Sequence, residues 1–468
     1  MITKIIPSIW LQQNGRRLDC GPYLSGALEA RVQLERLSVP KQLLREVTKE
    51  GTAGIFNGPR FAREYVNNPS FGIPFLGSTE ILWADLSVLP LLSKKQVAEH
   101  PELIIHPGWT LITCSGSIGR MAYARPDMEG MVGTQHFMRV VPDTTKIPSG
   151  YLFSYLSSKY GVPLIVGGTY GAIIQHIEPN HISDLPIPRF GESLENRAHE
   201  LVEKAALNIA KFSKLCQEAT CCLFERLGFA DSDDSEWYAD KRNIGWIQKA
   251  INSESFRAMN YDPRARDYWK RLEQHGADPL GSLCVPEFFK GKNIFKRIDV
   301  SPEYGYMLVG QRNAFHLRPE GRWISKKSVE GLGLLVPPMT TMIPSHGTLG
   351  EQELYCRALL VTNRTSKFVF SGDFFRCIPQ QEKIRPGYLF AFLRSRTAFR
   401  MLRSISIGGK QQEQHPAMMW RFPIPRLSSS DEGRIAEMID EAARCYDSGL
   451  DAEDEARLMV EKAIEEAT

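Results

Sequence analysis

The sequence lacks any stretch of about 18 consecutive apolar residues, the length that a helix needs to cross a membrane. Residues 1–10 are soon followed by Gln12, Gln13, Asn14, Arg16 and Arg17, which leaves no room for the apolar core of a signal peptide. We therefore expect a cytoplasmic protein. The chain has 468 residues, 43% of them hydrophobic, which is typical of a globular protein with two to four domains of about 100–200 residues each.

Metal-binding patterns are also missing. None of the nine cysteines forms a C-x-x-C pair, and no histidine pair lies at a matching spacing. Zinc sites need ligands paired at short spacings that a turn can accommodate. The sequence therefore predicts reduced, mostly buried thiols and no metal site.

Catalytic motifs are absent or incomplete. Ile407-Gly-Gly-Lys410 lacks the earlier glycine of a phosphate loop, and Gly331-Leu-Gly333 lacks the third glycine of a dinucleotide-binding turn. There is no H-E-x-x-H and no G-x-S-x-G. Ser115-Gly-Ser117 could form a nucleophile turn, but the matching segment of the second half is His346-Gly-Thr348, so a tight turn is favoured. We predict no catalytic residue.

Charge is distributed unevenly along the chain. The total is +3, but residues 428–468 contain 13 acidic and 4 basic residues, a net charge of −9, which leaves +12 on residues 1–427. A basic body with an acidic end is compatible with nucleic-acid binding without requiring it.

The second half of the chain repeats the first at an offset of about 231–241 residues. Six blocks recur in the same order: Asn57-Gly-Pro-Arg-Phe-Ala-Arg63 with Lys290-Gly-Lys-Asn-Ile-Phe-Lys296, Phe71-Gly-Ile-Pro-Phe-Leu-Gly77 with Tyr304-Gly-Tyr-Met-Leu-Val-Gly310, Ser93-Lys-Lys95 with Ser325-Lys-Lys327, Ser115-Gly-Ser-Ile-Gly119 with His346-Gly-Thr-Leu-Gly350, Lys146-Ile-Pro-Ser-Gly-Tyr-Leu-Phe153 with Lys383-Ile-Arg-Pro-Gly-Tyr-Leu-Phe390, and Leu185-Pro-Ile-Pro-Arg189 with Phe422-Pro-Ile-Pro-Arg426. Six ordered matches predict that one unit was duplicated.

Each half is predicted to end in a long helix. Residues 194–227 contain no glycine or proline, and their apolar residues recur in steps of three and four. The corresponding segment, 431–466, keeps this spacing, with Asp447-Ser-Gly449 as a candidate break because glycine costs about 1 kcal/mol inside a helix. Before each helix, short β-type runs and Gly/Pro turns surround one short helix, at 148–156 in the first half. Two such long helices can pack antiparallel.

The repeated order of an S-G-S-I-G or H-G-T-L-G loop, a G-Y-L-F helix, a Gly-Gly loop, an L-P-I-P or F-P-I-P exit and a long helix resembles the specificity subunit of type I restriction–modification systems. The resemblance covers nearly the whole chain. It implies an α+β fold with two tandem-duplicated α/β target recognition domains separated by two long antiparallel coiled-coil helices. The implied boundaries are 1–190 for the first domain, 191–228 for the central spacer helix, 229–257 for a linker, 258–427 for the second domain and 428–468 for the C-terminal spacer helix.

The resemblance also implies a function. In that family each recognition domain reads one half of a bipartite double-stranded DNA site, and the specificity subunit is not itself catalytic. Its helices dock methyltransferase subunits, here expected to be two, which bind S-adenosylmethionine and flip the target adenine. A restriction or translocase subunit joins some complexes. No cofactor is expected on this chain.

Residue types near the repeated motifs indicate where DNA would bind. Lys, Arg, Ser and Thr suit phosphates, and Arg, Asn and Gln can form paired hydrogen bonds with base edges. Candidates in the first half are Arg60, Arg63, Ser115, Ser117, Arg120, Gln135, His136, Tyr170, Gln175 and His176. Candidates in the second half are Lys296, Arg297, Gln311, Arg312, Lys326, Lys327, His346, Thr348, Lys410, Gln411, Gln412 and Gln414.

Two other interpretations are compatible with the sequence. A duplicated protein-binding scaffold with an incidental basic surface would assemble partners without preferring DNA. A stand-alone nuclease or transferase would turn over a substrate with a metal or nucleotide.

Overall fold

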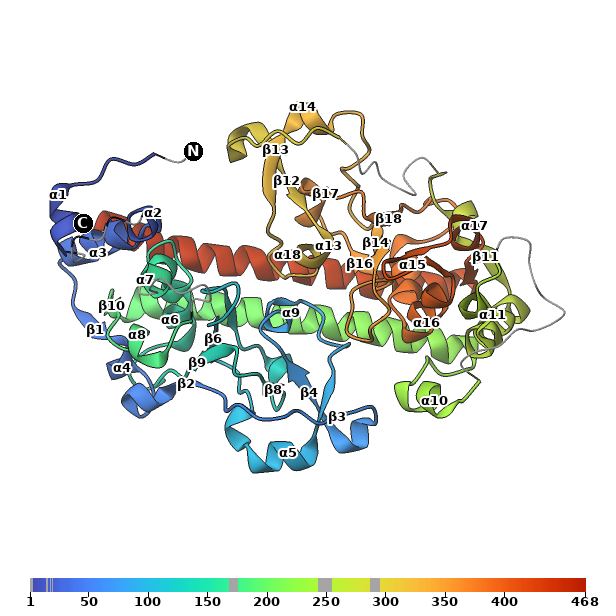
Figure 1. The fold of residues 1–468 in the computed structure, drawn as a ribbon, viewed down its shortest axis with the longest axis horizontal. Helices are drawn as coiled ribbons and strands as arrows, with labels where there is room; N and C mark the ends of the chain where they lie inside the picture. The colour runs from blue at the N-terminus through green and yellow to red at the C-terminus, as the bar shows by residue number, and fades with distance from the viewer. Residues whose placement is uncertain are drawn as a thin grey trace. The chain divides into compact units, whose positions relative to one another are not determined.

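The computed structural model describes residues 3–13, 16, 18, 20–167, 176–242, 255–286 and 295–468 (Figure 1). The chain divides into two compact units. Unit 1 contains Met1–Leu82, Leu89–Ala210 and Ser448–Thr468, and unit 2 contains Trp83–Val88 and Lys211–Asp447. Each unit therefore draws on both halves of the sequence. No described helix is long and apolar enough to span a bilayer.

Unit 1 is built from short strands and short helices. Its strands are β1 (Lys41–Leu43), β2 (Ile55–Asn57), β3 (Tyr65–Val66), β4 (Gly72–Leu76), β5 (Leu91–Ser93), β6 (Thr110–Thr113), β7 (Met121–Tyr123), β8 (Val132–Gly133), β9 (Phe137–Val140) and β10 (Pro186–Pro188). Its short helices are α1 (Ser8–Gln13), α2 (Gly21–Leu24), α3 (Ala27–Arg36), α4 (Leu44–Val47), α5 (Lys94–Glu99), α6 (Ser149–Leu156), α7 (Gly161–Gly167) and α8 (Pro179–Ile182). The strands form sheets in the orders β1-β10, β2-β9-β6-β7 and β3-β5-β4-β8.

Unit 2 has closely similar parts. Its strands are β11 (Ala277–Pro279), β12 (Gly305–Val309), β13 (Arg322–Ser325), β14 (Thr341–Pro344), β15 (His346–Gly347), β16 (Leu359–Leu360), β17 (Val369–Phe370), β18 (Phe374–Cys377), β19 (Ser406–Gly408), β20 (Gln412–Gln414) and β21 (Pro423–Pro425). Its short helices are α10 (Asp234–Ala239), α11 (Pro263–His275), α12 (Leu280–Leu283), α13 (Gln311–Ala314), α14 (Lys326–Val329), α15 (Pro386–Leu393), α16 (Arg396–Ser404) and α17 (Pro416–Trp420). The sheet orders are β11-β21, β13-β12-β17, β16-β14-β18 and β15-β20-β19.

The pairing of strands confirms the duplication. In unit 1, β4 pairs antiparallel with β5 and parallel with β8, and in unit 2, β12 pairs in the same way with β13 and β17. Likewise β6 lies between β7 and β9, and β14 lies between β16 and β18, all antiparallel. The α+β fold class with two duplicated units is therefore as predicted.

A glycine in each unit lets a short helix approach a long one closely. The predicted helix at 148–156 is α6, and its counterpart is α15. A Cβ on Gly150 would lie 2.8 Å from the Cα of His199, and a Cβ on Gly387 would lie 2.6 Å from the carbonyl oxygen of Ala436. Both neighbours are backbone atoms of a long helix, so only glycine fits at the start of the repeated G-Y-L-F motif.

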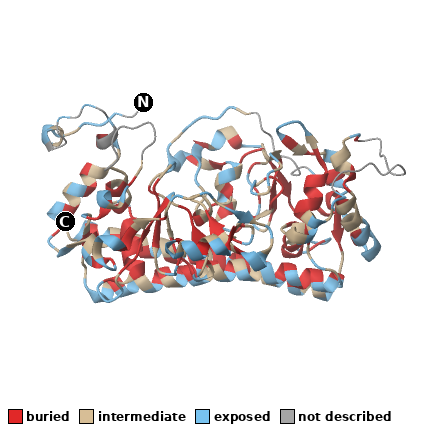
Figure 2. Cartoon of the chain, turned by 60° about the horizontal axis from the view of Figure 1, so that its bottom comes forward, coloured by how far each residue is buried: buried red, intermediate tan, exposed pale blue. Residues whose placement is uncertain are grey.

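The long helices are α9 (Glu192–Leu227) and α18 (Ser429–Glu466), and they run antiparallel within each unit. Figure 2 shows buried and exposed residues alternating along a long helix. The apolar residues whose spacing predicted the helices are buried: Val202, Ala205, Ile209, Phe212, Cys216, Ala219, Leu223, Ile435, Ile439, Ala442, Tyr446, Ala456 and Val460. In unit 1, Asn208 donates to Ser448 (3.3 Å). In unit 2, Lys211 bonds Glu441 (2.8 Å) and Arg226 lies 3.2 Å from Asp431. Residues further along α9 therefore contact earlier residues of α18, as in an antiparallel pair.

The expected break near 447–449 is wrong, because α18 continues through it. A Cβ on Gly449 would lie 2.9 Å from the Cδ1 of Ile209 and 3.2 Å from the carbonyl oxygen of Ala205. The missing side chain therefore allows α9 and α18 to approach each other. Close packing here offsets the low helix propensity of glycine.

A duplicated ion pair fixes the start of each long helix. Arg189 contacts both carboxylate oxygens of Glu195, at 3.0 and 2.6 Å, and Arg426 contacts those of Glu432 at 2.8 and 3.1 Å. Both carboxylates are buried, and each also accepts a backbone N–H from the residue after its arginine. Such paired contacts hold a guanidinium in one orientation.

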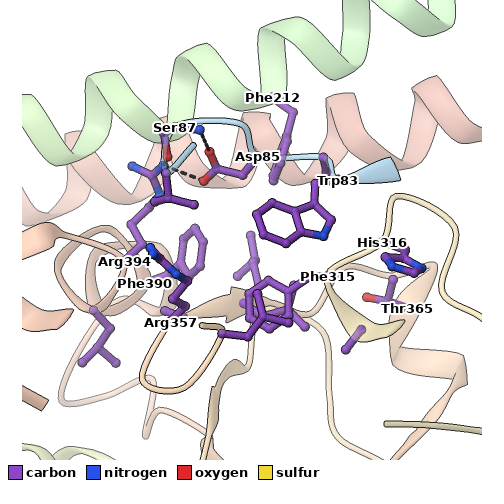
Figure 3. Close-up of a pocket in the computed structure, with 18 of the residues that line it drawn as sticks. Trp83, Asp85, Ser87, Phe212, Phe315, His316, Arg357, Thr365, Phe390 and Arg394 are labelled. Carbon is purple, nitrogen blue, oxygen red and sulfur yellow. Dashed lines mark hydrogen bonds and ion pairs between the residues drawn. The ribbon is translucent and has the colours of Figure 1, made fainter. Parts of the chain in front are cut away.

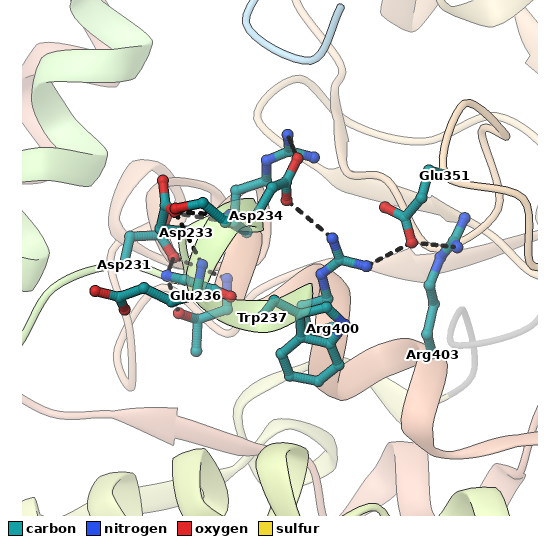
Figure 4. Close-up of polar contacts among 12 residues, drawn as sticks. Asp231, Asp233, Asp234, Glu236, Trp237, Glu351, Arg400 and Arg403 are labelled. Atoms are coloured by element: carbon teal, nitrogen blue, oxygen red, sulfur yellow. Dashed lines mark hydrogen bonds and ion pairs between the residues drawn. The ribbon is translucent and has the colours of Figure 1, made fainter. Parts of the chain in front are cut away.

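Part of the predicted linker folds onto α16 in unit 2 (Figure 4). Asp234, at the start of α10, bonds Arg396 at 2.6 Å and Arg400 at 2.9 Å. On its other side, Arg400 bonds Glu351 at 2.6 Å. Burial alone would raise the pKa of Glu351, but its contacts with Arg400 outweigh this, so the pKa lies below its ordinary value. The linker therefore docks on unit 2 through a buried guanidinium.

All nine cysteines are free thiols in the structure. Seven are buried, and burial raises the pKa of the Cys114 thiol to about 11. Cys20 and Cys221 are exposed. Among the described residues, no three His, Cys, Asp or Glu side chains form a group that could hold a metal ion.

Candidate nucleic-acid interface

Predicted DNA-contacting residues from distant parts of the sequence meet in unit 1. Arg63 lies in the segment between β2 and β3, and Gln135 lies in the turn between β8 and β9. The Nη2 of Arg63 donates to the Oε1 of Gln135 (2.9 Å) and to the hydroxyl of Thr134 (2.8 Å). This brings together groups about 70 residues apart, as the parallel pairing of β4 with β8 requires.

His136 extends this contact to the S-G-S-I-G turn. Its Nε2 lies 3.2 Å from the Nε2 of Gln135, and its Nδ1 lies 2.9 Å from the hydroxyl of Ser115. Since the Oε1 of Gln135 accepts from Arg63, its amide nitrogen must donate, so the Nε2 of His136 accepts. The imidazole is then neutral and donates from Nδ1 to Ser115. The chain of hydrogen bonds runs Arg63, Gln135, His136, Ser115.

The pKa of His136 agrees with this assignment. Burial lowers the pKa of the imidazole, and the nearby charges of Arg63, Arg60 and His176 lower it further. Three of the predicted residues therefore lie within electrostatic range of the His136 side chain. His176 is also joined to Ser115 by a β-bridge. We call Arg60, Arg63, Ser115, Gln135, His136 and His176 the unit 1 cluster.

The S-G-S-I-G segment is a tight turn between β6 and β7. The backbone N–H of Thr113 donates to the carbonyl of Arg120 (2.8 Å), and the Thr113 hydroxyl accepts from the Arg120 N–H (3.0 Å). Gly116 and Gly119 have φ values of +75° and +83°, which favour glycine. Ser117 is exposed at the tip of the turn. A tight turn, as favoured from the sequence, is what forms.

A buried arginine holds the turn that contains Gln135 through hydrogen bonds to its backbone. Arg139 in β9 is fully buried, and its Nη2 donates to the carbonyl of Gly133 (2.8 Å) while its Nη1 contacts that of Thr134 (3.3 Å). Arg376, at the matching place in β18, donates in the same way to Phe370 (2.8 Å) and Ser371 (3.0 Å). Burial lowers the pKa of each guanidinium to about 10. The same internal support therefore holds both turns.

Unit 2 keeps the frame of the cluster but changes its chemistry. The strand pairings match Ser115 with His346 and His136 with Asp373. The Nδ1 of His346 lies 3.8 Å from Asp373, and its Nε2 lies 3.4 Å from Glu413. In unit 1 the Ser115–His136 contact lies beside arginines, whereas in unit 2 the corresponding His346 lies between two carboxylates.

Exposed polar groups of unit 2 lie on a hairpin made by β19 and β20. Lys410 and Gln411 are exposed at its tip. Gly408 has a φ of +97°, and a Cβ there would lie 2.6 Å from the carbonyl oxygen of Gln411. Arg257 donates to the carbonyl of Gly408 (3.0 Å) and fixes the hairpin from one side.

The prediction that Gln412 and Gln414 present their side chains to DNA is corrected by the structure. Both are buried. The Nε2 of Gln414 donates to the carbonyl of Pro344 (3.0 Å) and contacts the sulfur of Cys356 (3.1 Å), and that of Gln412 bonds the carbonyl of Gly409. These amides satisfy backbone groups inside the unit, so they are unavailable to a base.

The remaining candidates are distributed more widely. Lys296, Arg297, Arg312, Lys326, Lys327 and Thr348 are exposed, and Arg120 is half-buried. Gln311 is half-buried and donates to the carbonyl of Asp373 (2.5 Å), which places it beside His346. Tyr170 and Gln175 lie outside the described residues. Thr134, Asp373 and Glu413 were not predicted, although Thr134 and Glu413 are each next to a predicted residue, Gln135 and Gln412.

Unit 2 also contains a largely apolar cavity of about 80 Å³ (Figure 3). Trp83, Phe212 and Phe315 line it. At one side Arg394 bonds Asp85 at 2.7 Å. Burial alone would raise the pKa of Asp85, but the Arg394 guanidinium more than offsets this, so the pKa lies below its ordinary value. The paired charges therefore lie at one side of an otherwise largely apolar cavity.

Comparison with known proteins gives structural similarity only. No family model matches the sequence, and no curated protein matches it. The chain is similar to the type I restriction–modification system S subunit from M. genitalium, with 11% identity over 92% of this chain and 96% of that one and a TM-score of 0.30. It is similar to the HsdS subunit from Thermoanaerobacter tengcongensis, with 12% identity over 91% and 96% and a TM-score of 0.26. A third similar chain comes from a study of complex assembly and conformational transition of the type I R-M system, with 13% identity over 92% and 98% and a TM-score of 0.26.

Proposed function

We propose that this chain is a DNA-specificity subunit that directs a partner adenine methyltransferase to a bipartite double-stranded DNA site. One observation carries the proposal. Two units share a frame of strands, turns and buried arginines, yet their polar residues differ at matched positions, Ser115 and His136 against His346 and Asp373. A protein that reads two different half-sites needs a common scaffold with different base-reading groups.

The polar residues around the matched positions suggest different base preferences in the two units. Arg63 and Gln135 can form paired hydrogen bonds with purines, Arg with guanine and Gln with adenine. In unit 2, Asp373 and Glu413 are acceptors that suit the amino group of cytosine. In this proposal Lys410, exposed at the hairpin tip, binds a phosphate.

The proposed assembly follows the same interpretation. Recognition domains at 1–190 and 258–427 would each bind a half-site, and the helices at 191–228 and 428–468 would dock two methyltransferase subunits, with residues 229–257 as the linker. S-adenosylmethionine would bind to those partners. The chain itself would perform no reaction and bind no cofactor, and a restriction or translocase subunit would join if the system cleaves DNA.

Mapping methylated adenines in cells with and without this chain tests the proposal. We expect one split motif to lose methylation when the chain is deleted. Arg63→Ala should relax recognition of one half of the motif, and Asp373→Asn should relax only the other half. Lys270→Ala, at an exposed lysine on α11 outside the proposed contacts, is the control and should leave both halves intact.

A methylation pattern that does not change on deletion contradicts the proposal. Partner assembly without any DNA preference would instead support a scaffold. Turnover of a substrate by the isolated chain would support an enzyme.

A further inference from the structure

One short motif keeps an exposed aromatic residue in both units. Asn68-Pro-Ser-Phe-Gly72 and Ser301-Pro-Glu-Tyr-Gly305 each form a single 3₁₀ turn followed by a strand, β4 or β12. Phe71 is 65% exposed and Tyr304 is 68% exposed. A large aromatic side chain gains little from the core when most of it stays in water, so its retention needs another explanation.

The glycine after the aromatic fixes the local geometry. A Cβ on Gly72 would lie 2.6 Å from the Cβ of Leu91, and one on Gly305 would lie 2.9 Å from the carbonyl oxygen of Ile324. β4 and β12 therefore pack closely against the neighbouring strands β5 and β13 at this glycine. The aromatic side chain just before it stays on the outside of the sheet.

Two lysines lie at the same end of the strand pair as the aromatic residue in each unit. Gly72 pairs antiparallel with Ser93, and Gly305 pairs with Ser325. Phe71 and Tyr304 come directly before these glycines, and Lys94 and Lys326 directly after these serines, so the aromatic residue and the lysine lie at the same end of each strand pair. The second lysine of each pair follows in the first turn of α5 or α14.

The contacts of the lysines leave them available to a ligand. Lys94 donates to the backbone carbonyl of Ser70 (3.0 Å), and the ammonium of Lys326 lies 5.7 Å from the ring centroid of Tyr306. All four lysines are exposed. We call Phe71 with Lys94 and Lys95, and Tyr304 with Lys326 and Lys327, the aromatic–lysine corners.

The corners stay the same where the proposed reading residues differ. Ser115 and His136 have been replaced by His346 and Asp373 at matched positions, and even the residue before the aromatic differs, Ser70 against Glu303. A group common to both units suits a feature common to both half-sites. In DNA that feature is the sugar–phosphate backbone, which has the same charge at every step.

We propose that the two aromatic–lysine corners are backbone clamps for double-stranded DNA. In each unit the lysines bind phosphates, and the ring packs against the adjoining sugar and base edge. This inference rests on the proposed function and adds a sequence-independent contact to it. In each unit α5 or α14 lies at the edge away from the long helices, so the corner is separate from the helix pair (Figure 1).

The test is salt-dependent binding of the full chain to a labelled duplex of mixed sequence, followed by fluorescence anisotropy. Binding through phosphates makes the logarithm of the affinity fall with the logarithm of the salt concentration, by about 0.9 for each phosphate contacted. Lys94→Ala/Lys95→Ala and Lys326→Ala/Lys327→Ala should each flatten the slope by up to about 1.8. Phe71→Ala and Tyr304→Ala should each weaken binding about fivefold with little change in slope, because the contact of the ring with the sugar and base edge is apolar and not ionic.

Matched controls separate the corners from general surface charge. Lys214→Ala/Lys462→Ala removes two exposed lysines from the long helices, and Phe256→Ala removes an aromatic that is 74% exposed outside the corners. Neither should weaken binding as the corner variants do. Lys94→Arg/Lys95→Arg keeps the charge and should keep the slope, and unchanged thermal unfolding of all variants excludes misfolding as the cause.

Each outcome bears on a different proposal. If the unaltered chain binds DNA with a steep salt dependence and the corner variants match it, the clamps are wrong while the proposed function stands. If the unaltered chain shows no salt-dependent binding, the proposed function fails with them. If the corner variants bind DNA normally but lose a methyltransferase subunit in co-purification, the corners are protein contacts and the DNA clamp is refuted.

Discussion

Replacing two helical glycines by alanine should change stability in opposite directions. Gly387 lies in α15 against the backbone of α18, whereas a Cβ on Gly433 in α18 would have no neighbour within 4 Å. Alanine favours a helix over glycine by about 0.5–1 kcal/mol. At Gly433 nothing opposes this gain, so Gly433→Ala should stabilise the protein by about that amount.

At Gly387 the steric cost is larger than the gain. The new methyl carbon would lie 2.6 Å from the carbonyl oxygen of Ala436 and 2.9 Å from its Cα. A backbone atom cannot rotate aside as a side chain can, so α15 would have to move away from α18 to remove the clash. Overpacking of this kind costs about 1–3 kcal/mol. Gly387→Ala should therefore destabilise unit 2 by about 1–2 kcal/mol after the helix gain is subtracted.

Differential scanning calorimetry of the full chain measures both effects. One kcal/mol shifts Tm by about 2–4 °C for units of this size, so we expect a fall of about 5 °C for Gly387→Ala and a rise of about 2 °C for Gly433→Ala. Gly150→Ala should behave like Gly387→Ala because its methyl would meet the backbone of His199. Equal shifts of the same sign for Gly387→Ala and Gly433→Ala would refute the close approach of α15 to α18.

Three further predictions concern the buried ion pairs and the interface. Glu195→Gln should destabilise the protein by about 3 kcal/mol in thermal unfolding, because breaking a buried ion pair leaves the charge of Arg189 without its partner. Glu432→Gln should cost less, because Arg426 keeps a second carboxylate, that of Asp278, at 2.5 Å. Equal losses of stability in the two variants would contradict this. The pKa of His136, measured by NMR titration, should lie below its ordinary value and should rise in Arg63→Met. Because the pKa is lowered in the folded state, the stability that neutral His136 contributes is lost as the pH falls through the folded pKa. If the substitution leaves the pKa of His136 unchanged, Arg63 is not a cause of the shift. Lys410→Ala should lower DNA affinity and leave Tm unchanged. Gln414→Ala should lower Tm, because the carbonyl of Pro344 loses its hydrogen-bond donor. If Tm stays constant in Gln414→Ala, Gln414 becomes a candidate for the DNA interface again.

Repetition and periodicity made the large features of the fold predictable. Ordered repeats showed the duplication, because matching blocks survive in the sequence itself. The apolar spacing over 194–227 predicted a long helix, and the structure has α9 from Glu192 to Leu227. Gly449 misled the prediction, because its effect depends on the neighbouring helix and not on its own propensity.

The interface was predictable only as a set of residue types. The sequence does not show that Arg63 reaches Gln135, because that contact depends on the long-range pairing of β4 with β8. Nor does it show that Gln414 points inward, since β20 is only three residues long and its polar residues give no alternation to follow. Short strands carry too few residues for a burial pattern to be recognised.

The core of unit 1 includes Val460 and Ile464 of α18, packed with residues such as Tyr151 and Ile187. A ribosome adds these two residues only after it has made all of unit 2. While the chain is being synthesised, the first unit to emerge must therefore wait for the last segment before its interior is complete. A product that stops before residue 448 would leave the earlier unit with an open apolar face, prone to aggregate or to be degraded.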